Sequence, residues 1–255
     1  MSTKEVDLSV SNYGTTKDLE YQVAILPWGA TEPHNLHLPY MTDAILSHDV
    51  AVDAAKLALK RHGIRAMVLP PVTLGQQNPG QRDLKFCIHG RYETQKAILT
   101  DIASSLYHQG IERLLIVNGH GGNSFKNMIR DLAVDIPDML IAVTEWYKAL
   151  PAKEYFDNPG DHADELETSV MMHYHPELVN LAEAGEGKGG GFAPASLASG
   201  LAWIPRNWSK VSRDTGIGSP ALSSSEKGRK YAEAVASAYA DLIRDLTLPE
   251  LYRPI

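Results

Sequence analysis

Short apolar segments that alternate with longer helical segments constrain the fold of this 255-residue chain more than any other feature. Four short apolar runs bounded by polar or turn-forming residues predict buried strands, at residues 21–26, 65–69, 113–117 and 139–144. Helical spacing of apolar residues predicts helices at residues 44–61, 94–107, 123–134, 165–175 and 226–246. This alternation favours a three-layer α/β/α fold around a mostly parallel sheet, and the length fits a single domain over residues 1–255.

Ligands of such sheets gather in the loops beyond the carboxyl ends of the strands. We therefore expect the loops that follow residues 26, 69, 117 and 144 to meet and to form the functional site. A further segment, residues 183–200, is rich in Gly, Ala and Ser and is predicted to be a mobile connection or lid.

Charge and cysteine content exclude several classes of function. The formal net charge is −7 and no run of Lys or Arg occurs, so we expect no nucleic-acid partner. Cys87 is the only cysteine, which rules out an intramolecular disulfide or a zinc cluster of cysteines within one chain. No signal peptide is recognisable, and no segment approaches the roughly 20 apolar residues of a membrane span. We expect a cytoplasmic protein with no membrane partner.

The first of three clusters of potential metal ligands comes directly after the first predicted strand. The loop WGATEPHNLHLPYMTDA holds Glu32, His34, His37 and Asp43. Imidazole and carboxylate groups suit Zn²⁺, Mn²⁺ and Fe²⁺, a loop can fold several of them around one point, and Asp43 could bridge two ions. Solvated turn residues are the alternative interpretation of this loop, and its composition alone does not decide between the two.

The second cluster is NGHGGN, which places His120 among small residues just beyond the third predicted strand. Glycines let the backbone turn tightly and approach a ligand. A plain strand-to-helix turn is the alternative. The loop lacks the glycine spacing and the Lys-Ser/Thr ending of a phosphate-binding loop, which disfavours a nucleotide site.

The third cluster, GDHADELETS, brings four carboxylates and a histidine to the start of a predicted helix: Asp161, His162, Asp164, Glu165 and Glu167. Carboxylates at that position are favourable for the helix dipole alone. His162 is not explained in that way, and an imidazole beside a carboxylate can transfer a proton near neutral pH.

These three motifs, in this order, resemble the creatininase (creatinine amidohydrolase) family. The resemblance extends from about residue 23 to the last predicted helix, where GIGSPALSSSEKGRKYAEAV is similar to the C-terminal signature of the family. It implies a metal-dependent amidohydrolase with a three-layer α/β fold that assembles as a homo-oligomer, a hexamer in this family. It also implies one or two divalent ions per chain, Zn in the first place and Mn or Fe as alternatives.

The resemblance assigns roles to individual residues. Glu32, Asp43 and His120 match the ligands of one metal ion, and His34 with a bridging Asp43 matches those of a second. His162 matches the proton-transfer histidine of the family. Glu167 matches a carboxylate close to the metals, which we predict to be catalytic and also a metal ligand.

One departure from the family pattern concerns the second ion. In creatininase itself a carboxylate follows the histidine of the second motif by two residues, but this chain has Gly122 at that position. Either Glu167 supplies the missing ligand, or the second ion is weakly bound or absent. Creatinine as the substrate is thereby put in doubt.

A second departure concerns the pocket. The sequence FCIHGRYET at residues 86–94 replaces the usual apolar-Pro-Gly-Thr stretch of the family, so we expect a pocket of different shape. His89 in this stretch could face the site or lie on the surface. Trp146, after the fourth predicted strand, could cover the substrate or pack in the core.

We therefore predict a hydrolase that uses a metal-activated water to cleave a cyclic amide or another non-peptide C–N bond of a small-molecule amide. A deformylase or a peptidase-type member of the family is an alternative. Two other classes stay open: a non-catalytic protein that binds a small ligand on the same fold, which the absence of a carboxylate at Gly122 leaves possible, and a structural, self-assembling protein. Metal content separates the non-catalytic binder from the enzyme.

Overall fold

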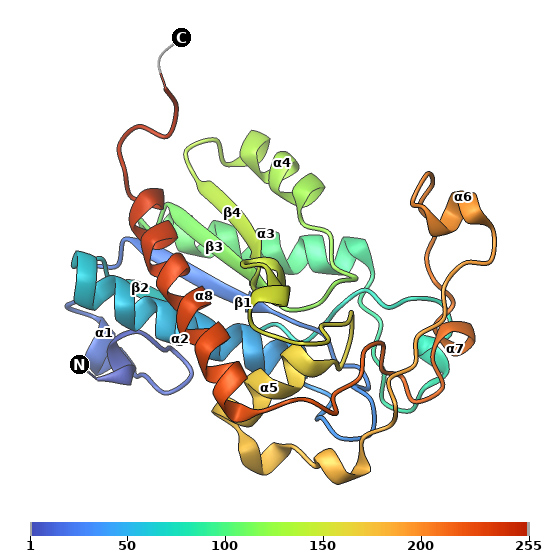
Figure 1. Ribbon diagram of the computed structural model, residues 1–255. Coiled ribbons are helices and arrows are strands. Elements are labelled where there is room, and N and C mark those ends of the chain that lie inside the picture. Colours follow the sequence, from blue (N-terminus) through green and yellow to red (C-terminus); the bar gives the residue numbers. More distant parts are fainter. Residues whose placement is uncertain (1, 254–255) are drawn as a thin grey trace.

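The computed structural model describes residues 2–253, and a four-stranded sheet lies between two layers of helices (Figure 1). The strands are β1 (Val23–Trp28), β2 (Ala66–Val68), β3 (Arg113–Asn118) and β4 (Leu140–Glu145). The α-helices are α1 (Tyr13–Thr16), α2 (Thr42–His62), α3 (Tyr92–His108), α4 (Lys126–Asp135), α5 (Glu165–Tyr174), α6 (Ala195–Ala198), α7 (Trp208–Val211) and α8 (Ser225–Leu246). All neighbouring strands are parallel, so the predicted three-layer α/β fold with a parallel sheet is confirmed. The predicted domain of residues 1–255 also takes in residues 1, 254 and 255, which lie outside the described range.

The two faces of the sheet are covered by different helices. Val23 and Ile25 of β1 pack in one core with α2, α5 and α8. The alternate residues Ala24, Leu26 and Trp28 pack in a second core with α3 and α4. Because both faces are buried, strands of this kind read as unbroken apolar runs, which is why the sequence predicts them well.

The strand order β2-β1-β3-β4 places β1 beside β3 at the centre of the sheet. The helix that follows β1 is α2, which lies on one face, whereas the helix that follows β3 is α4, which lies on the other (Figure 1). The chain therefore leaves β1 toward one face of the sheet and β3 toward the other, and such a switch point at the carboxyl edge of a sheet is where ligands bind. The first two ligand clusters of the sequence lie in these two loops.

Two boundaries differ from the sequence prediction. The first strand continues through Pro27 to Trp28 rather than ending at residue 26. Proline has no N–H to donate to a neighbouring strand. The carbonyl of Pro27 accepts from the N–H of Val72, which shows that this side of Pro27 faces the chain beyond the end of β2. The missing N–H of Pro27 therefore costs the sheet no hydrogen bond. The helix expected from residue 123 begins at Lys126, because the Asn123 side chain is used to tie neighbouring loops together.

Among residues 2–253, no helix is long and apolar enough to cross a membrane. The N-terminal segment instead pairs with the outer edge of the sheet, where the N–H of Leu8 donates to the carbonyl of Val68 at 2.9 Å.

Candidate metal centre

Six side chains from the three sequence motifs converge at the carboxyl edge of the sheet, and all six are buried: Glu32, His34, Asp43, His120, His162 and Glu167. The loop after β1 carries the first two, and Asp43 lies in the first turn of α2. Gly119 permits the close approach of α2, because a Cβ atom there would lie 2.3 Å from the carbonyl oxygen of Asp43. The loops after the two central strands thus meet as the sequence predicts.

The first group of potential ligands consists of Glu32, Asp43 and His120, whose ligand atoms lie within 4.8 Å of one another. Nδ1 of His120 lies 2.9 Å from Oε1 of Glu32 and 3.2 Å from Oδ2 of Asp43. Oδ2 of Asp43 is buried and receives no well-directed hydrogen bond from the described residues. A buried carboxylate oxygen without a donor is costly, and a cation in this group would satisfy it.

The second group consists of His34, Asp43 and Glu167. Nε2 of His34 lies 2.9 Å from Oδ1 of Asp43, so the two oxygens of Asp43 face different groups. One oxygen of Glu167, Oε2, accepts from the backbone N–H of Ala163 at 2.6 Å. Asp43 therefore has the arrangement that a bridging carboxylate needs.

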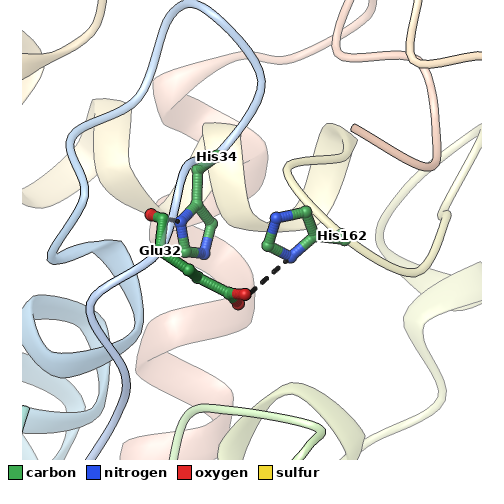
Figure 2. A group of neighbouring side chains, drawn as sticks. All are labelled: Glu32, His34 and His162. Atoms are coloured by element: carbon green, nitrogen blue, oxygen red, sulfur yellow. Dashed lines mark hydrogen bonds and ion pairs between the residues drawn. The ribbon is translucent and has the colours of Figure 1, made fainter. Parts of the chain in front are cut away.

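A third group adds His162 to Glu32 and His34 (Figure 2). Nδ1 of His162 lies 3.7 Å from Oε1 of Glu32, and the rings of His34 and His162 lie 4.3 Å apart. His162 is thus close enough to the first two groups to exchange a proton with a molecule bound there.

Each of the three histidines in the site has one ring nitrogen bound to a backbone carbonyl. His34 Nδ1 lies 3.0 Å from the Glu32 carbonyl oxygen, His120 Nε2 lies 2.7 Å from that of Gln76, and His162 Nε2 lies 2.9 Å from that of Pro33. A carbonyl can only accept, so each bond places a proton on the nitrogen that faces it. The other nitrogen of each ring faces the carboxylates, and in the neutral ring it carries the lone pair that binds a metal ion.

Burial and close opposite charges perturb the ionisation of the site. Burial alone would raise the pKa of Glu32, but His120 and His162 hold it below its usual value. Burial alone would lower the pKa of His34, but Asp43 raises it to about 10. Burial likewise opposes protonation of His120, yet Glu32 and Asp43 raise its pKa well above the usual value. The buried carboxylates thus stabilise positive charge beside them, and a divalent cation would supply that charge.

The pKa values of Glu167 and His162 shift in the direction that favours the neutral form of each group. Burial raises the pKa of Glu167 to about 8, although the nearby His34 opposes this change. Burial and the positive charge on His34 lower the pKa of His162. His162 is therefore neutral at physiological pH and can accept a proton.

The cluster lies at a cavity of about 770 Å³ that is lined by Glu32, Asp43, His120, His162 and Glu167 among others. Trp203, Arg206 and Trp208 also line this cavity, and the Trp208 ring packs edge-on against His162 at 5.3 Å. The glycine-rich stretch predicted as a lid ends just before these residues and lines a separate surface pocket instead. The segment that lines the cavity beside the cluster includes residues 203–206 and 208, which the composition of the sequence did not single out.

Several residues of the sequence motifs have other roles. His37 is buried away from the cluster, and its Nε2 lies 2.8 Å from the Thr168 hydroxyl. Asp164 is the N-cap of α5 and accepts from the N–H of Glu167 at 3.0 Å. Glu165 pairs with Lys227. The helix-capping explanation of these carboxylates is therefore right for Asp164.

The structure also decides between the alternative positions of Trp146 and His89. Trp146 is fully buried and packs against Tyr231, so it is a core residue. His89 is exposed and also lines the cavity.

Two glutamines that the sequence analysis missed contact the cluster. Gln81 is buried and donates from Nε2 to Oε2 of Glu32, and the carbonyl of Gln76 bonds His120. A glutamine in a polar loop looks like a solvated residue, so nothing local in the sequence marks either one.

Comparison with known proteins gives a consistent result. The family model described as "Creatininase: Creatinine amidohydrolase" matches residues 8–243. The mycofactocin precursor peptide peptidase of Mycobacterium ulcerans is 28% identical over 86% of this chain and 84% of its own length. The creatinine amidohydrolase of Pseudomonas putida is 25% identical over 91% of this chain and 94% of its own length.

Solved structures agree with these sequence matches. A putative creatinine amidohydrolase from Bacteroides fragilis is 58% identical, with a TM-score of 0.97 over 99% of this chain and 100% of that one. Structures of creatininase with Mn and of a mutant creatininase of Zn–Zn type are each 23% identical, with TM-scores of 0.75 over 96% of this chain and 100% of theirs. The latter two share the fold, and the metals they name fit the imidazole and carboxylate donors gathered here.

Proposed function

The chain belongs to the creatininase family, and from this premise we propose that it is a metal-dependent hydrolase that cleaves the C–N bond of a small, cyclic or otherwise non-peptide amide. The observation that carries this proposal is the set of buried ligand groups that share Glu32, His34 and Asp43 beside a cavity large enough for a small molecule. A protein that only binds a ligand has no need for such a set, because each buried charge costs free energy.

We assign two ion positions to the site. Glu32, Asp43 and His120 would hold one divalent ion, and His34, Asp43 and Glu167 would hold the other. Zn is the first choice, with Mn or Fe as alternatives, since histidine and carboxylate ligands suit all three.

Gly122 supports the assignment of Glu167 as a ligand. A Cβ atom at position 122 would lie 2.1 Å from the carbonyl oxygen of Gln76 and 2.5 Å from Nε2 of His120. The space that a carboxylate side chain would need is therefore filled by backbone, and the second ion needs its carboxylate from elsewhere. Glu167 already lies beside His34 and Asp43.

A bound divalent ion activates water and polarises the amide carbonyl. The residues of this chain would do the rest. His162, neutral because of its lowered pKa, would accept at Nδ1 the proton lost by the attacking water and pass it to the departing nitrogen, while the Pro33 carbonyl accepts from Nε2 on the other side of the ring. Trp208 packs against His162 and keeps water from that side of the ring.

The substrate is proposed only as a class. Creatinine is not favoured, because the loop after β3 differs from that of creatininase at Gly122. Peptide-type C–N cleavage is the second candidate, favoured by the similarity to the mycofactocin precursor peptide peptidase. Assays with creatinine, an N-formyl compound and a short peptide amide distinguish these classes.

We further propose that the protein is a cytoplasmic homo-oligomer without a nucleic-acid partner. The negative net charge and the family resemblance support this proposal. Light scattering coupled to size exclusion measures the assembly.

Metal analysis of the purified protein tests the proposed function. Wild type prepared without chelators is expected to hold two ions, and Glu167→Ala is expected to hold one. Glu177→Ala, which removes an exposed carboxylate outside the three ligand groups, is the control and should hold two. One ion in every protein would remove Glu167 from the ligand set and indicate a mononuclear enzyme. No metal in wild type would contradict a metal-dependent hydrolase and favour the binding protein.

A further inference from the structure

Gln81 links the loop between β2 and α3 to the proposed metal ligand Glu32. Its side chain is 1% exposed and belongs to a short 3-10 helix, Gln81–Asp83. Oε1 accepts from the backbone N–H of Asn78 at 2.6 Å, and Nε2 donates to Oε2 of Glu32. Both polar atoms of the Gln81 amide are therefore hydrogen-bonded, the oxygen to the backbone of its own turn and the nitrogen to the carboxylate of Glu32.

This contact makes the two oxygens of Glu32 different. Oε2 is engaged by Gln81. Oε1 faces the cluster instead and lies 2.9 Å from Nδ1 of His120. Nδ1 of His162 lies 3.7 Å from the same oxygen (Figure 2). We propose that Gln81 is a positioning residue that occupies Oε2 and so leaves Oε1 as the one oxygen of Glu32 available to a metal ion. This inference rests on the proposed function, because it requires Glu32 to bind metal.

Glutamine has the right chemistry for this task. Its amide donates to a carboxylate without adding charge, so it does not compete with the cation, as a lysine or arginine at the same place would. It also has an acceptor for the Asn78 N–H, which a charged donor lacks. Because both ends are bonded in the folded protein, the carboxylate is oriented before any ion arrives.

The consequence for the site is an unfilled ligand position. A carboxylate can bind an ion through one oxygen or through both, and catalytic metal sites keep a position open for water or substrate. By holding Oε2, Gln81 keeps Glu32 from closing that position.

Cobalt substitution tests the proposal through a signal that a purely structural role would not move. Gln81→Met has nearly the same length and removes both the donor and the acceptor. Its Co²⁺ form is expected to absorb less strongly in the visible range than the wild-type form, because a second oxygen of Glu32 raises the coordination number. Its affinity for Zn²⁺, measured by competition with a chromophoric chelator, is expected to fall by about 10- to 100-fold, as for other residues that orient metal ligands.

Gln77→Met is the matched control. Gln77 lines the same cavity, but its side chain makes no hydrogen bond to Glu32 among the described residues. Its variant should keep the wild-type spectrum and affinity. Should Gln81→Met fail to fold, Gln81→Leu removes the same donor and acceptor with a smaller side chain and adds no charge beside Glu32, so the same changes are expected.

An unchanged Co²⁺ spectrum in the folded Gln81 variants would overturn the proposal, even with weaker Zn²⁺ binding, because Gln81 would then only support its loop. Wild-type protein that binds neither Zn²⁺ nor Co²⁺ would instead contradict the proposed function itself. The two failures are therefore distinguishable.

Discussion

Replacement of Gly122 by alanine tests why this chain lacks a carboxylate in the loop after β3. The added Cβ would lie 2.1 Å from the Gln76 carbonyl oxygen and 2.5 Å from Nε2 of His120. Both atoms belong to one hydrogen bond, 2.7 Å long, that orients His120. The obstacle is backbone and a fixed ring rather than the end of a flexible side chain, so one of the two must move.

The structure sets the size of the expected effect. Inserting a methyl group into a packed site costs about 1–3 kcal/mol, and loss of the His120 hydrogen bond adds about 1 kcal/mol. We therefore expect Gly122→Ala to lower the free energy of unfolding by about 2–4 kcal/mol. Since the displaced ring is a proposed ligand, Zn²⁺ affinity should also fall by about 10- to 100-fold.

Urea unfolding of the metal-free protein and chelator competition measure the two effects. Gly121→Ala is the matched control, because a Cβ at position 121 meets only the Tyr147 hydroxyl, at an ordinary 3.5 Å. Its unfolding free energy should stay the same or rise by about 0.4–1 kcal/mol, as for Gly→Ala changes at unstrained positions. Equal behaviour of the two variants would refute the reasoning. It would show that position 122 has room for a side chain and would weaken the assignment of Glu167 as the substitute ligand.

Three further predictions concern proton transfer, a buried ion pair and pH. His162→Gln should reduce kcat by about 10²- to 10⁴-fold while metal content stays at the wild-type value, and a loss of metal would instead make His162 a ligand. Lys227→Met removes the cation that pairs with the fully buried Glu165. Because Lys227 is itself partly exposed and Glu165 keeps the N–H donors of Asp157 and Asn158, the free energy of unfolding should fall by about 1–3 kcal/mol in urea titrations, whereas no loss would contradict this account. Burial alone would lower the pKa of His48, but the neighbouring carboxylates of Asp49 and Asp7 hold it above its usual value. The stabilisation from His48 is thus complete below about pH 6.5 and is lost as the pH rises through the folded-state pKa, so His48→Gln should remove this part of the pH dependence of unfolding. Parallel stability profiles for wild type and His48→Gln would contradict it.

The sequence predicts the sheet because the signal for a buried strand is local. The apolar runs at β1 and β3 predict strands without any knowledge of their neighbours. The predicted boundaries are wrong where the end of a strand or helix depends on a contact with a distant part of the chain. Pro27 stays in β1 because β2 has already ended beside it, and Asn123 delays α4 because it binds the loop at Gln76. Neither reason can be read from the residues nearby.

By itself, the sequence determined the parallel α/β fold, the three motifs and the side chains that could bind metal, because motif spacing and apolar periodicity are properties of short stretches of chain. Only the tertiary structure decided which members of each motif meet. It turned His37 away toward Thr168 and buried Trp146 in the core. It also brought Gln81 to Glu32, 49 residues away. Such contacts form when loops from different strands close over one another, and the shape of that closure depends on the packing of the whole sheet and both helix layers.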